Sequence, residues 1–155
     1  MLLILNDNNI DIDNILFGEK IKNNIIDNSF FYQLYYGNQS FTLSSLVFEF
    51  NIPNISISSC YNKQKIEYDY EKYKSSFEKI INLEKTVLEA FMERKNINSN
   101  MCYYKMEDTF KNNYIKISID NIGFINRKNC NILIKISGIW ENNNTYGINY
   151  KFIVK

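Results

Sequence analysis

The sequence of 155 residues is 45% hydrophobic and 15% aromatic, so it holds too many core-forming side chains for a disordered protein and enough for one folded domain. Its 18 basic and 17 acidic residues give a net charge of +1, which excludes the strongly basic composition typical of many polyanion-binding domains. The absence of histidine removes the commonest general acid–base residue and the usual zinc sites.

The cysteines and the apolar segments indicate a cellular compartment. Cys60, Cys102 and Cys130 are widely spaced and form no C-x-x-C motif, which predicts free thiols in a reducing environment. The opening Met1–Leu5 is too short for a signal peptide, and no apolar run approaches the length that spans a membrane. We therefore expect a soluble cytoplasmic protein with no cofactor, no metal and no membrane partner.

A first β group is predicted over residues 10–60. Aromatic and apolar side chains dominate Phe30–Tyr36, and Gly37-Asn38 then supplies a two-residue loop that is typical of hairpins. Pro53 is expected to end the partner strand because proline donates no backbone hydrogen bond to a sheet. The expected strands are a short one between residues 10 and 26, then Phe30–Tyr36, Phe41–Ile52 and Ile55–Cys60.

An amphipathic helix is predicted from Asp69 to Lys95. Apolar side chains between Tyr70 and Phe91 recur at spacings of three and four residues, with glutamates and lysines between them. The segment contains neither glycine nor proline, and Asp69 is a suitable N-cap. Its charged face is expected to be solvated, with a partner-binding surface as the alternative.

A second β group is predicted over residues 114–155. Isoleucines alternate with polar residues from Ile115 to Ile119, and a closing hairpin follows from the strands Asn131–Trp140 and Tyr146–Lys155. Gly138 is a suitable position for a β-bulge. The second strand of the hairpin is expected to present one apolar face, made by Tyr146, Ile148, Tyr150, Phe152 and Val154.

The elements follow the order β-β-β-α-β-β-β, so the sequence predicts a mainly β single domain of residues 1–155 with one long helix. A single helix between a first β group and a closing hairpin favours the OB-fold, a five-stranded Greek-key barrel. Two other layouts stay open. One is an antiparallel α+β sheet with the helix packed across it, and the other is a jelly-roll fragment.

No catalytic motif is visible in the sequence. It lacks the G-x-x-x-x-G-K-[ST], G-x-G-x-x-G and G-x-S-x-G patterns. The carboxylate pairs Asp11/Asp13 and Glu107/Asp108 are expected to be ordinary solvated acids. The sequence therefore favours a binding protein over an enzyme.

Aromatic and lysine side chains on the expected strands are the remaining functional candidates. Proteins that hold single-stranded nucleic acid combine aromatic platforms for base stacking with a basic groove along the phosphates. The candidate platforms are Tyr32, Tyr35, Tyr36, Trp140, Tyr146 and Tyr150. The candidate phosphate contacts are Lys116, Arg127, Lys128, Lys135 and Lys151. Most of these aromatics are expected in the core, with Tyr35 and Trp140 as the exposed exceptions.

Three segments carry a resemblance to a known family. They are Ile15–Lys20, the paired strands around Gly37, and the hairpin of Lys135–Trp140 with Tyr146–Lys151, together with the long helix between them. This layout resembles the small OB-fold single-stranded-DNA-binding proteins of large nucleocytoplasmic DNA viruses and phages. The resemblance implies an accessory protein of replication or recombination that coats single-stranded DNA or RNA. Phage-type members generally end in an acidic tail, whereas this sequence ends in Lys155.

The composition favours an A/T-rich source. The chain holds 25 asparagines and 25 isoleucines, both with A/T-rich codons, against one alanine and one proline. We therefore expect a protein of an A/T-rich virus, parasite or cytoplasmic element, located in the host cytoplasm or at a viral replication site. The alternative function is a viral structural or assembly protein, a homo-oligomer that would bury apolar strands such as Phe41–Phe50 between subunits.

Overall fold

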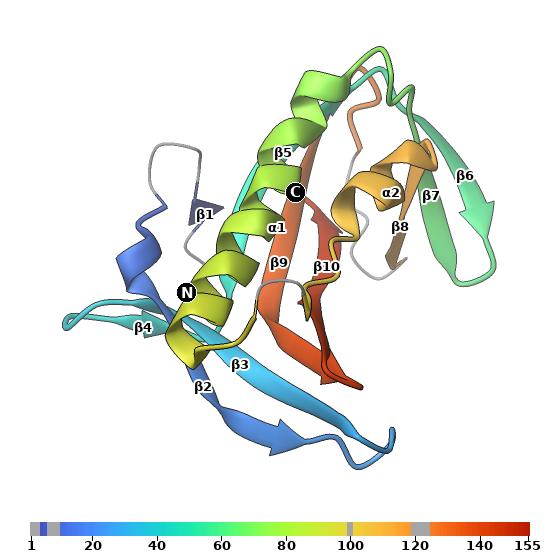
Figure 1. The fold of residues 1–155 in the computed structure, drawn as a ribbon. Helices are drawn as coiled ribbons and strands as arrows, with labels where there is room; N and C mark the ends of the chain where they lie inside the picture. Colours follow the sequence, from blue (N-terminus) through green and yellow to red (C-terminus); the bar gives the residue numbers. More distant parts are fainter. Residues whose placement is uncertain (1–3, 6–9, 99–100, 119–124) are drawn as a thin grey trace.

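The computed structural model describes residues 4–5, 10–98, 101–118 and 125–155 (Figure 1). The strands before the long helix are β1 Ile4–Leu5, β2 Ile15–Lys22, β3 Ser29–Gly37, β4 Thr42–Leu43, β5 Leu46–Pro53, β6 Ser56–Cys60 and β7 Lys63–Glu67. The helices are α1 Lys74–Lys95 and α2 Met106–Lys111, with a 3-10 turn, η1, at Ile12–Asn14. The last strands are β8 Tyr114–Ser118, β9 Asn129–Asn142 and β10 Thr145–Val154. The expectation of a mainly β chain with one long helix is confirmed.

Strand β9, with 14 residues, is the centre of the larger sheet. One edge of β9 pairs with β10, and the other edge pairs first with β5 and then with β3. The sheet continues to β2 beyond β3 and to β1 beyond β5, and the β1–β5 pair is the parallel one among the described strand pairs of this sheet. Strand β9 therefore belongs to the closing hairpin and also pairs with strands from the first part of the chain.

The core lies between this sheet and α1, which crosses one face of the sheet (Figure 1). Ile132, Ile134 and Ile136 of β9 are each 0% exposed and belong to the same apolar cluster as Phe77 of α1. The Phe77 ring is surrounded by four other rings at centroid distances of 4.6 to 6.5 Å, those of Phe50, Tyr68, Tyr70 and Phe110. Burial of such side chains, at about 1.5–3 kcal/mol each, is what fixes α1 to the sheet.

A β-bulge in β9 decides which side chains face away from α1. The pairing register places Gly138 opposite Asn149 but Ile136 opposite Tyr150, so Ser137 is an extra residue in β9. Beyond the bulge the alternation is shifted by one position, and Trp140 consequently faces away from α1. The bulge expected near Gly138 is confirmed.

The closing hairpin turns at Asn143-Asn144, where φ is 48° and 61°. Two left-handed residues in a two-residue loop match the right-handed twist of the flanking strands, and asparagine tolerates this conformation better than most residues. The predicted closing hairpin is therefore confirmed. Its strands extend further toward the turn than predicted, because β9 ends at Asn142 rather than Trp140 and β10 begins at Thr145 rather than Tyr146.

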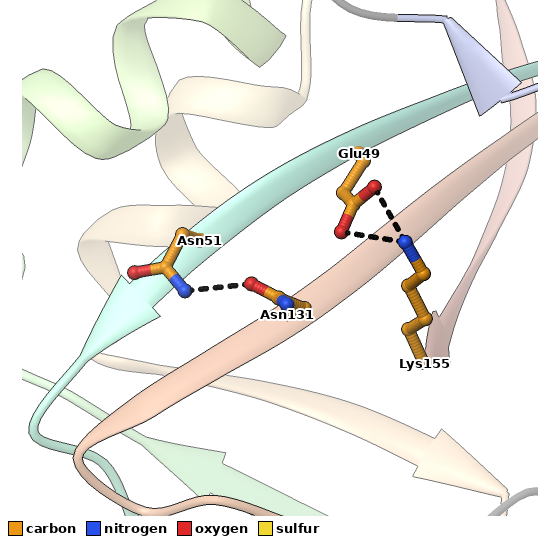
Figure 2. Close-up of polar contacts among 4 residues, drawn as sticks. All are labelled: Glu49, Asn51, Asn131 and Lys155. Carbon is orange, nitrogen blue, oxygen red and sulfur yellow. Dashed lines mark hydrogen bonds and ion pairs between the residues drawn. The ribbon is translucent and has the colours of Figure 1, made fainter.

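The far end of β10 is tied to β5 by polar contacts (Figure 2). Lys155 Nζ lies 3.2 Å from Oε1 and 3.0 Å from Oε2 of Glu49, and the Lys155 N–H donates to the Asn131 carbonyl at 3.1 Å. Beside them, Asn51 Nδ2 donates to Asn131 Oδ1 at 2.8 Å. Glu49 and Lys155 thus neutralise each other's charge.

A smaller antiparallel sheet of β6, β7 and β8 packs beside the larger one. Its Ile66, Ile115 and Ile117 are at most 2% exposed and join the same core. Helix α2 precedes β8, and its Phe110 is also fully buried. Strand β7 and helix α2 were not expected, because Lys63–Glu67 is mostly polar and α2 is only 6 residues long.

The long helix begins at Lys74 rather than at the predicted Asp69. Asp69 Oδ1 instead accepts a hydrogen bond from the Lys72 N–H at 3.1 Å and so caps a separate turn. Tyr68 and Tyr70 are 7% and 1% exposed, because this turn directs both rings into the core. The predicted end of the helix at Lys95 is confirmed.

The predicted hairpin of Phe30–Tyr36 with Phe41–Ile52 forms only next to its turn, where Gly37 pairs with Thr42 and Tyr36 with Leu43. Only Thr42-Leu43 pairs with β3, whereas Leu46–Pro53 pairs with β9. The apolar β5 is buried more completely at the centre of the sheet, and this long-range pairing overrides the local loop.

The described strands form two open sheets, so the expected closed barrel of an OB-fold is not seen. The arrangement is nearer to the alternative of an antiparallel sheet with one helix packed across it. Ile119 of the predicted strand, and part of the connection predicted after it, lie outside the described residues. Neither of the described helices is long and apolar enough to cross a membrane.

Candidate functional site

A cleft of about 750 Å³ follows the edge of β10 that faces away from β9. Strand β8, helix α2 and the segment before α2 form its other walls. Its lining includes four lysines and five aromatic residues: Lys63, Lys105, Lys116, Lys151, Tyr103, Tyr114, Trp140, Tyr150 and Phe152. No aspartate or glutamate is among its described lining residues. This cavity is termed the lysine cleft, and such one-sign linings attract ligands of the opposite charge.

The lysines of the cleft are not neutralised by described residues. The ion pairs in the described part of the chain are Lys20–Glu141, Lys111–Glu107 and Lys155–Glu49. None of these lysines lines the cleft. A near-neutral chain thus concentrates uncompensated positive charge in one cavity.

A buried glutamate holds one wall of the cleft in place. Glu84 of α1 is 1% exposed and accepts hydrogen bonds from the N–H groups of Lys105 at 2.9 Å and Met106 at 3.0 Å. These amides start α2, where helical hydrogen bonding leaves N–H groups without partners. On the other side, the Tyr103 N–H donates to the Tyr146 carbonyl at 2.7 Å. The segment that carries Tyr103 and Lys105 is therefore fixed both to α1 and to β10.

Glu84 also predicts a pH dependence of stability. Burial raises the pKa of Glu84 above its ordinary value, although the two amide donors lower it. A carboxyl with a raised folded-state pKa contributes its stabilisation fully below its unfolded-state pKa and loses it as the pH rises toward the folded-state pKa. Glu84→Gln is expected to reduce this loss of unfolding free energy with rising pH, as measured by urea unfolding at several pH values. A fall of the same size in the Gln variant would assign the effect to other groups.

Trp140 lies across the backbone of Gly147 on the facing strand. A β-carbon at Gly147 would come within 2.3 Å of the Trp140 indole, so only glycine leaves room for the ring there. The Tyr103 ring lies beside it, with 6.1 Å between the ring centroids. Trp140 is half-buried and Tyr103 is 47% exposed. The two rings form an accessible aromatic pair at one end of the cleft.

Phe31 extends this aromatic surface across the sheet, although the sequence alone does not predict it as a site residue. Phe31 of β3 pairs directly with Trp140 of β9 and is half-buried. Its ring lies over Gly138, where a β-carbon would come within 2.4 Å of the ring. The sequence shows an aromatic in a strand at this position, but not which glycine lies beneath it.

A second cavity, of about 500 Å³, includes Glu49, Asn51 and Asn131 in its lining. The Glu49 carboxylate is already paired with Lys155, and the two asparagine side chains are hydrogen-bonded to each other (Figure 2). Its charged and amide groups are thus engaged within the fold. The lysine cleft is the better candidate because its cations have no such partner among the described residues.

The structure brings four of the predicted site residues together in the lysine cleft: Lys116, Trp140, Tyr150 and Lys151. A fifth, Lys135, lies directly opposite Lys151 on the neighbouring strand. Tyr103, Lys105 and Lys63 also line the cleft but were not predicted. No repeating pattern marks the first two in the sequence, because they belong to an irregular segment.

Three predicted stacking residues, Tyr32, Tyr36 and Tyr146, belong to the core instead, and Tyr146 is 7% exposed. Tyr32 is 6% exposed, its ring contacts Phe91 of α1 at 4.8 Å, and its hydroxyl donates to Glu141 at 2.8 Å. Tyr36 is 4% exposed, and its hydroxyl accepts a hydrogen bond from the Asp11 N–H at 3.3 Å. Both side chains lie on the face of β3 that α1 covers, so neither ring is available to a ligand.

Three further candidates are exposed but lie outside the cleft lining. Tyr35 is 36% exposed on β3, as expected, with its ring edge beside Gly18. Arg127 and Lys128 precede β9, and their carbonyl groups accept hydrogen bonds from the backbone of residues 54–55. The structure therefore does not gather these three side chains with Lys116, Trp140 and Lys151.

Comparison with protein-family models, with curated proteins and with solved structures finds no match to this chain.

Proposed function

We propose that the chain binds single-stranded nucleic acid in the lysine cleft without strong preference for base sequence. The observation that carries this proposal is the place of Trp140, which is seated on Gly147 beside Tyr103 in a cavity that holds lysines and no described carboxylate. A single strand offers unpaired bases for the rings and phosphates for the lysines.

Binding divides between the two kinds of side chain. Bases stack on the aromatic pair Trp140 and Tyr103, each stacked base contributing about 1–3 kcal/mol. Phosphates contact Lys105, Lys116 and Lys151 and release bound counterions, so the affinity falls as the salt concentration rises. A duplex keeps its base faces covered and gains less from the rings. Single strands are therefore preferred to double strands.

The wider role follows from the same chemistry. A chain that holds single strands without reading their bases suits an accessory function in replication or recombination, in the cytoplasm or at a viral replication site. A strand in the cleft requires only the β8, α2 and β10 walls, so this role does not depend on a closed OB-fold barrel.

Trp140 tests the proposal directly because it is the only tryptophan. Addition of a dT oligonucleotide at low salt is expected to quench its fluorescence, and added salt is expected to restore it. Trp140→Ala is expected to lower the affinity for labelled dT roughly 5- to 150-fold, measured by fluorescence anisotropy. An emission spectrum that does not move at low salt would contradict the proposal.

Two variants sharpen this experiment. Tyr35→Ala removes an exposed aromatic outside the cleft and is expected to leave dT binding unchanged. Gly147→Ala retains the indole but forces it from its seat, because the new β-carbon would lie 2.3 Å from the ring. It is expected to weaken binding and to shift the emission of free Trp140.

A structural or assembly protein is the second candidate, and the exposed apolar side chains favour it. Six of them belong to β2, β3 and the neighbouring loops: Leu16, Ile21, Ile25, Ile26, Tyr35 and Phe41. Exposed apolar surface of this kind supports association between subunits. Gel filtration with light scattering separates the two functions. A stable oligomer indifferent to dT would favour assembly, and a salt-sensitive shift with dT would favour nucleic-acid binding.

A further inference from the structure

Two pairs of lysines occupy directly opposed positions on neighbouring strands, and one lysine of each pair lines the lysine cleft. Lys116 of β8 lies directly opposite Lys65 of β7, and Lys151 of β10 lies directly opposite Lys135 of β9. Like charges in directly opposed positions destabilise a sheet. The two like charges of each pair are therefore expected to repel each other in the unliganded protein.

None of the four lysines forms an ion pair with a described residue. The Tyr114 ring lies 4.4 Å from Lys65 Nζ and 5.9 Å from Lys116 Nζ, which favours both cations but removes neither charge. Lys65 and Lys135 are also half-buried, so water screens them less than it screens a fully exposed lysine.

We infer that the two lysine pairs are two phosphate seats for one linear polyanion. The inference rests on the proposed function, because it names the backbone contacts of the same ligand. Lys116 and Lys151 line the cleft from strands of different sheets, so a chain with a phosphate at each pair crosses the cleft. Its negative charge relieves the repulsion within both pairs, and ligand binding consequently stabilises the fold.

The groups around the seats favour a nucleic-acid strand as the polyanion. Each seat presents two ammonium groups to an anion with several acceptor oxygens, which describes a phosphate. Trp140, Tyr103 and Tyr150 line the same cleft and suit the bases that a nucleic acid carries between its phosphates. Inorganic polyphosphate shares the backbone chemistry but has no bases, so the two sources are separable by experiment.

The repulsion makes an unusual prediction for the unliganded protein. Lys116→Gln and Lys151→Gln are each expected to raise the midpoint temperature of thermal unfolding at low salt by about 1–3 °C, while lowering dT affinity. Adding Lys65→Gln to Lys116→Gln is expected to give no further rise, because the repulsion of that pair is already gone. Lys22→Gln is the matched control, since the residue opposite Lys22 is Phe30, and no rise is expected.

A ligand experiment separates this inference from the proposed function. Tripolyphosphate is expected to raise the unfolding temperature of the natural chain more than that of the Lys65→Gln/Lys116→Gln variant. If tripolyphosphate gives this larger rise while dT leaves Trp140 emission unchanged, the inference of two phosphate seats is supported and the single-strand proposal fails. If dT quenches Trp140 equally in both proteins, and Lys116→Gln brings no rise in unfolding temperature, the seats are overturned and the single-strand proposal stands.

Discussion

Replacement of Lys105, Lys116 and Lys151 together by glutamine is expected to lower the affinity for a dT oligonucleotide roughly 100-fold at about 0.1 M salt. Each lost phosphate contact removes about 0.7 from the slope of log affinity against log salt, so three lost contacts lower the slope by about 2. Anisotropy titrations of labelled dT at several salt concentrations measure both quantities. The physical reason is that these lysines share one cavity without a described carboxylate.

The control for this variant is a second triple variant with the same net charge. Lys22, Lys72 and Lys128 are exposed and lie outside the described cleft lining, so replacing them by glutamine removes the same net charge from other surfaces. This second triple variant is expected to retain most of the affinity and most of the salt slope. An equal loss in both variants would mean that general charge, rather than the lysine cleft, governs binding.

Phe77→Ala is expected to lower the free energy of unfolding by about 3–5 kcal/mol. The side chain is 0% exposed, and its ring contacts rings of β5, of α2 and of the turn before α1. Its removal leaves a cavity where three parts of the fold meet. The expected loss is a large share of the total stability of a domain of this size, so urea unfolding at low temperature is the suitable measurement.

Two further variants make the Phe77 result interpretable. Phe41→Ala truncates the same residue type at a position that is 38% exposed, and it is expected to change stability by less than about 0.5 kcal/mol. Phe77→Leu keeps most of the buried volume and is expected to cost less than Phe77→Ala. A loss below about 1 kcal/mol in Phe77→Ala would show that the surrounding rings close the cavity by repacking.

Local patterns in the sequence predict some elements of the fold well. The closing hairpin follows from alternation in β9 and β10 and from asparagines at the turn, all of which lie close together in the chain. The end of α1 at Lys95 follows from helical spacing that stops there. Such features depend on neighbours in sequence, and the pattern of side chains records them.

Pairing between strands that lie far apart in the sequence cannot be predicted from local patterns. The alternation of β5 indicates a strand, but nothing local indicates that Phe48 pairs with Ile134 rather than with β3. The same limit applies to the start of α1, because the core draws in Tyr68 and Tyr70 and delays the helix. The partner of β5 and the start of α1 therefore could not be predicted from local residues, because both depend on burial against distant parts of the chain.

In the candidate site too, local patterns predict some residues, and the remaining ones depend on long-range packing. Lys116 and Lys151 were predicted because alternation places them on polar strand faces, and Trp140 because it lies near a turn. That these three line one cleft depends on how the two sheets pack, which alternation does not encode. Tyr103 and Lys105 reach the cleft because the Tyr146 carbonyl and Glu84 hold their segment, and Glu84 lies 21 and 22 positions from the residues it contacts.

The asparagine turn of the closing hairpin belongs to a pattern that runs through the whole described chain. The described residues with positive φ are Tyr61 and six asparagines, Asn28, Asn54, Asn96, Asn113, Asn143 and Asn144, and no described glycine adopts positive φ. Asparagine thus takes the place that glycine holds in most turns. Glycine stands instead at positions such as Gly138 and Gly147, where a ring or a backbone leaves no space for a β-carbon.

The use of asparagine at positions of positive φ has an evolutionary consequence. In A/T-rich coding sequence, a single base change within A and T turns an asparagine codon into one for lysine, isoleucine or tyrosine. Isoleucine is strained at positive φ, and lysine and tyrosine adopt it less readily than asparagine. An A/T-rich coding sequence, which the composition predicts, would therefore tend to replace these six exposed asparagines with residues less suited to positive φ, and such replacements are expected to be disfavoured.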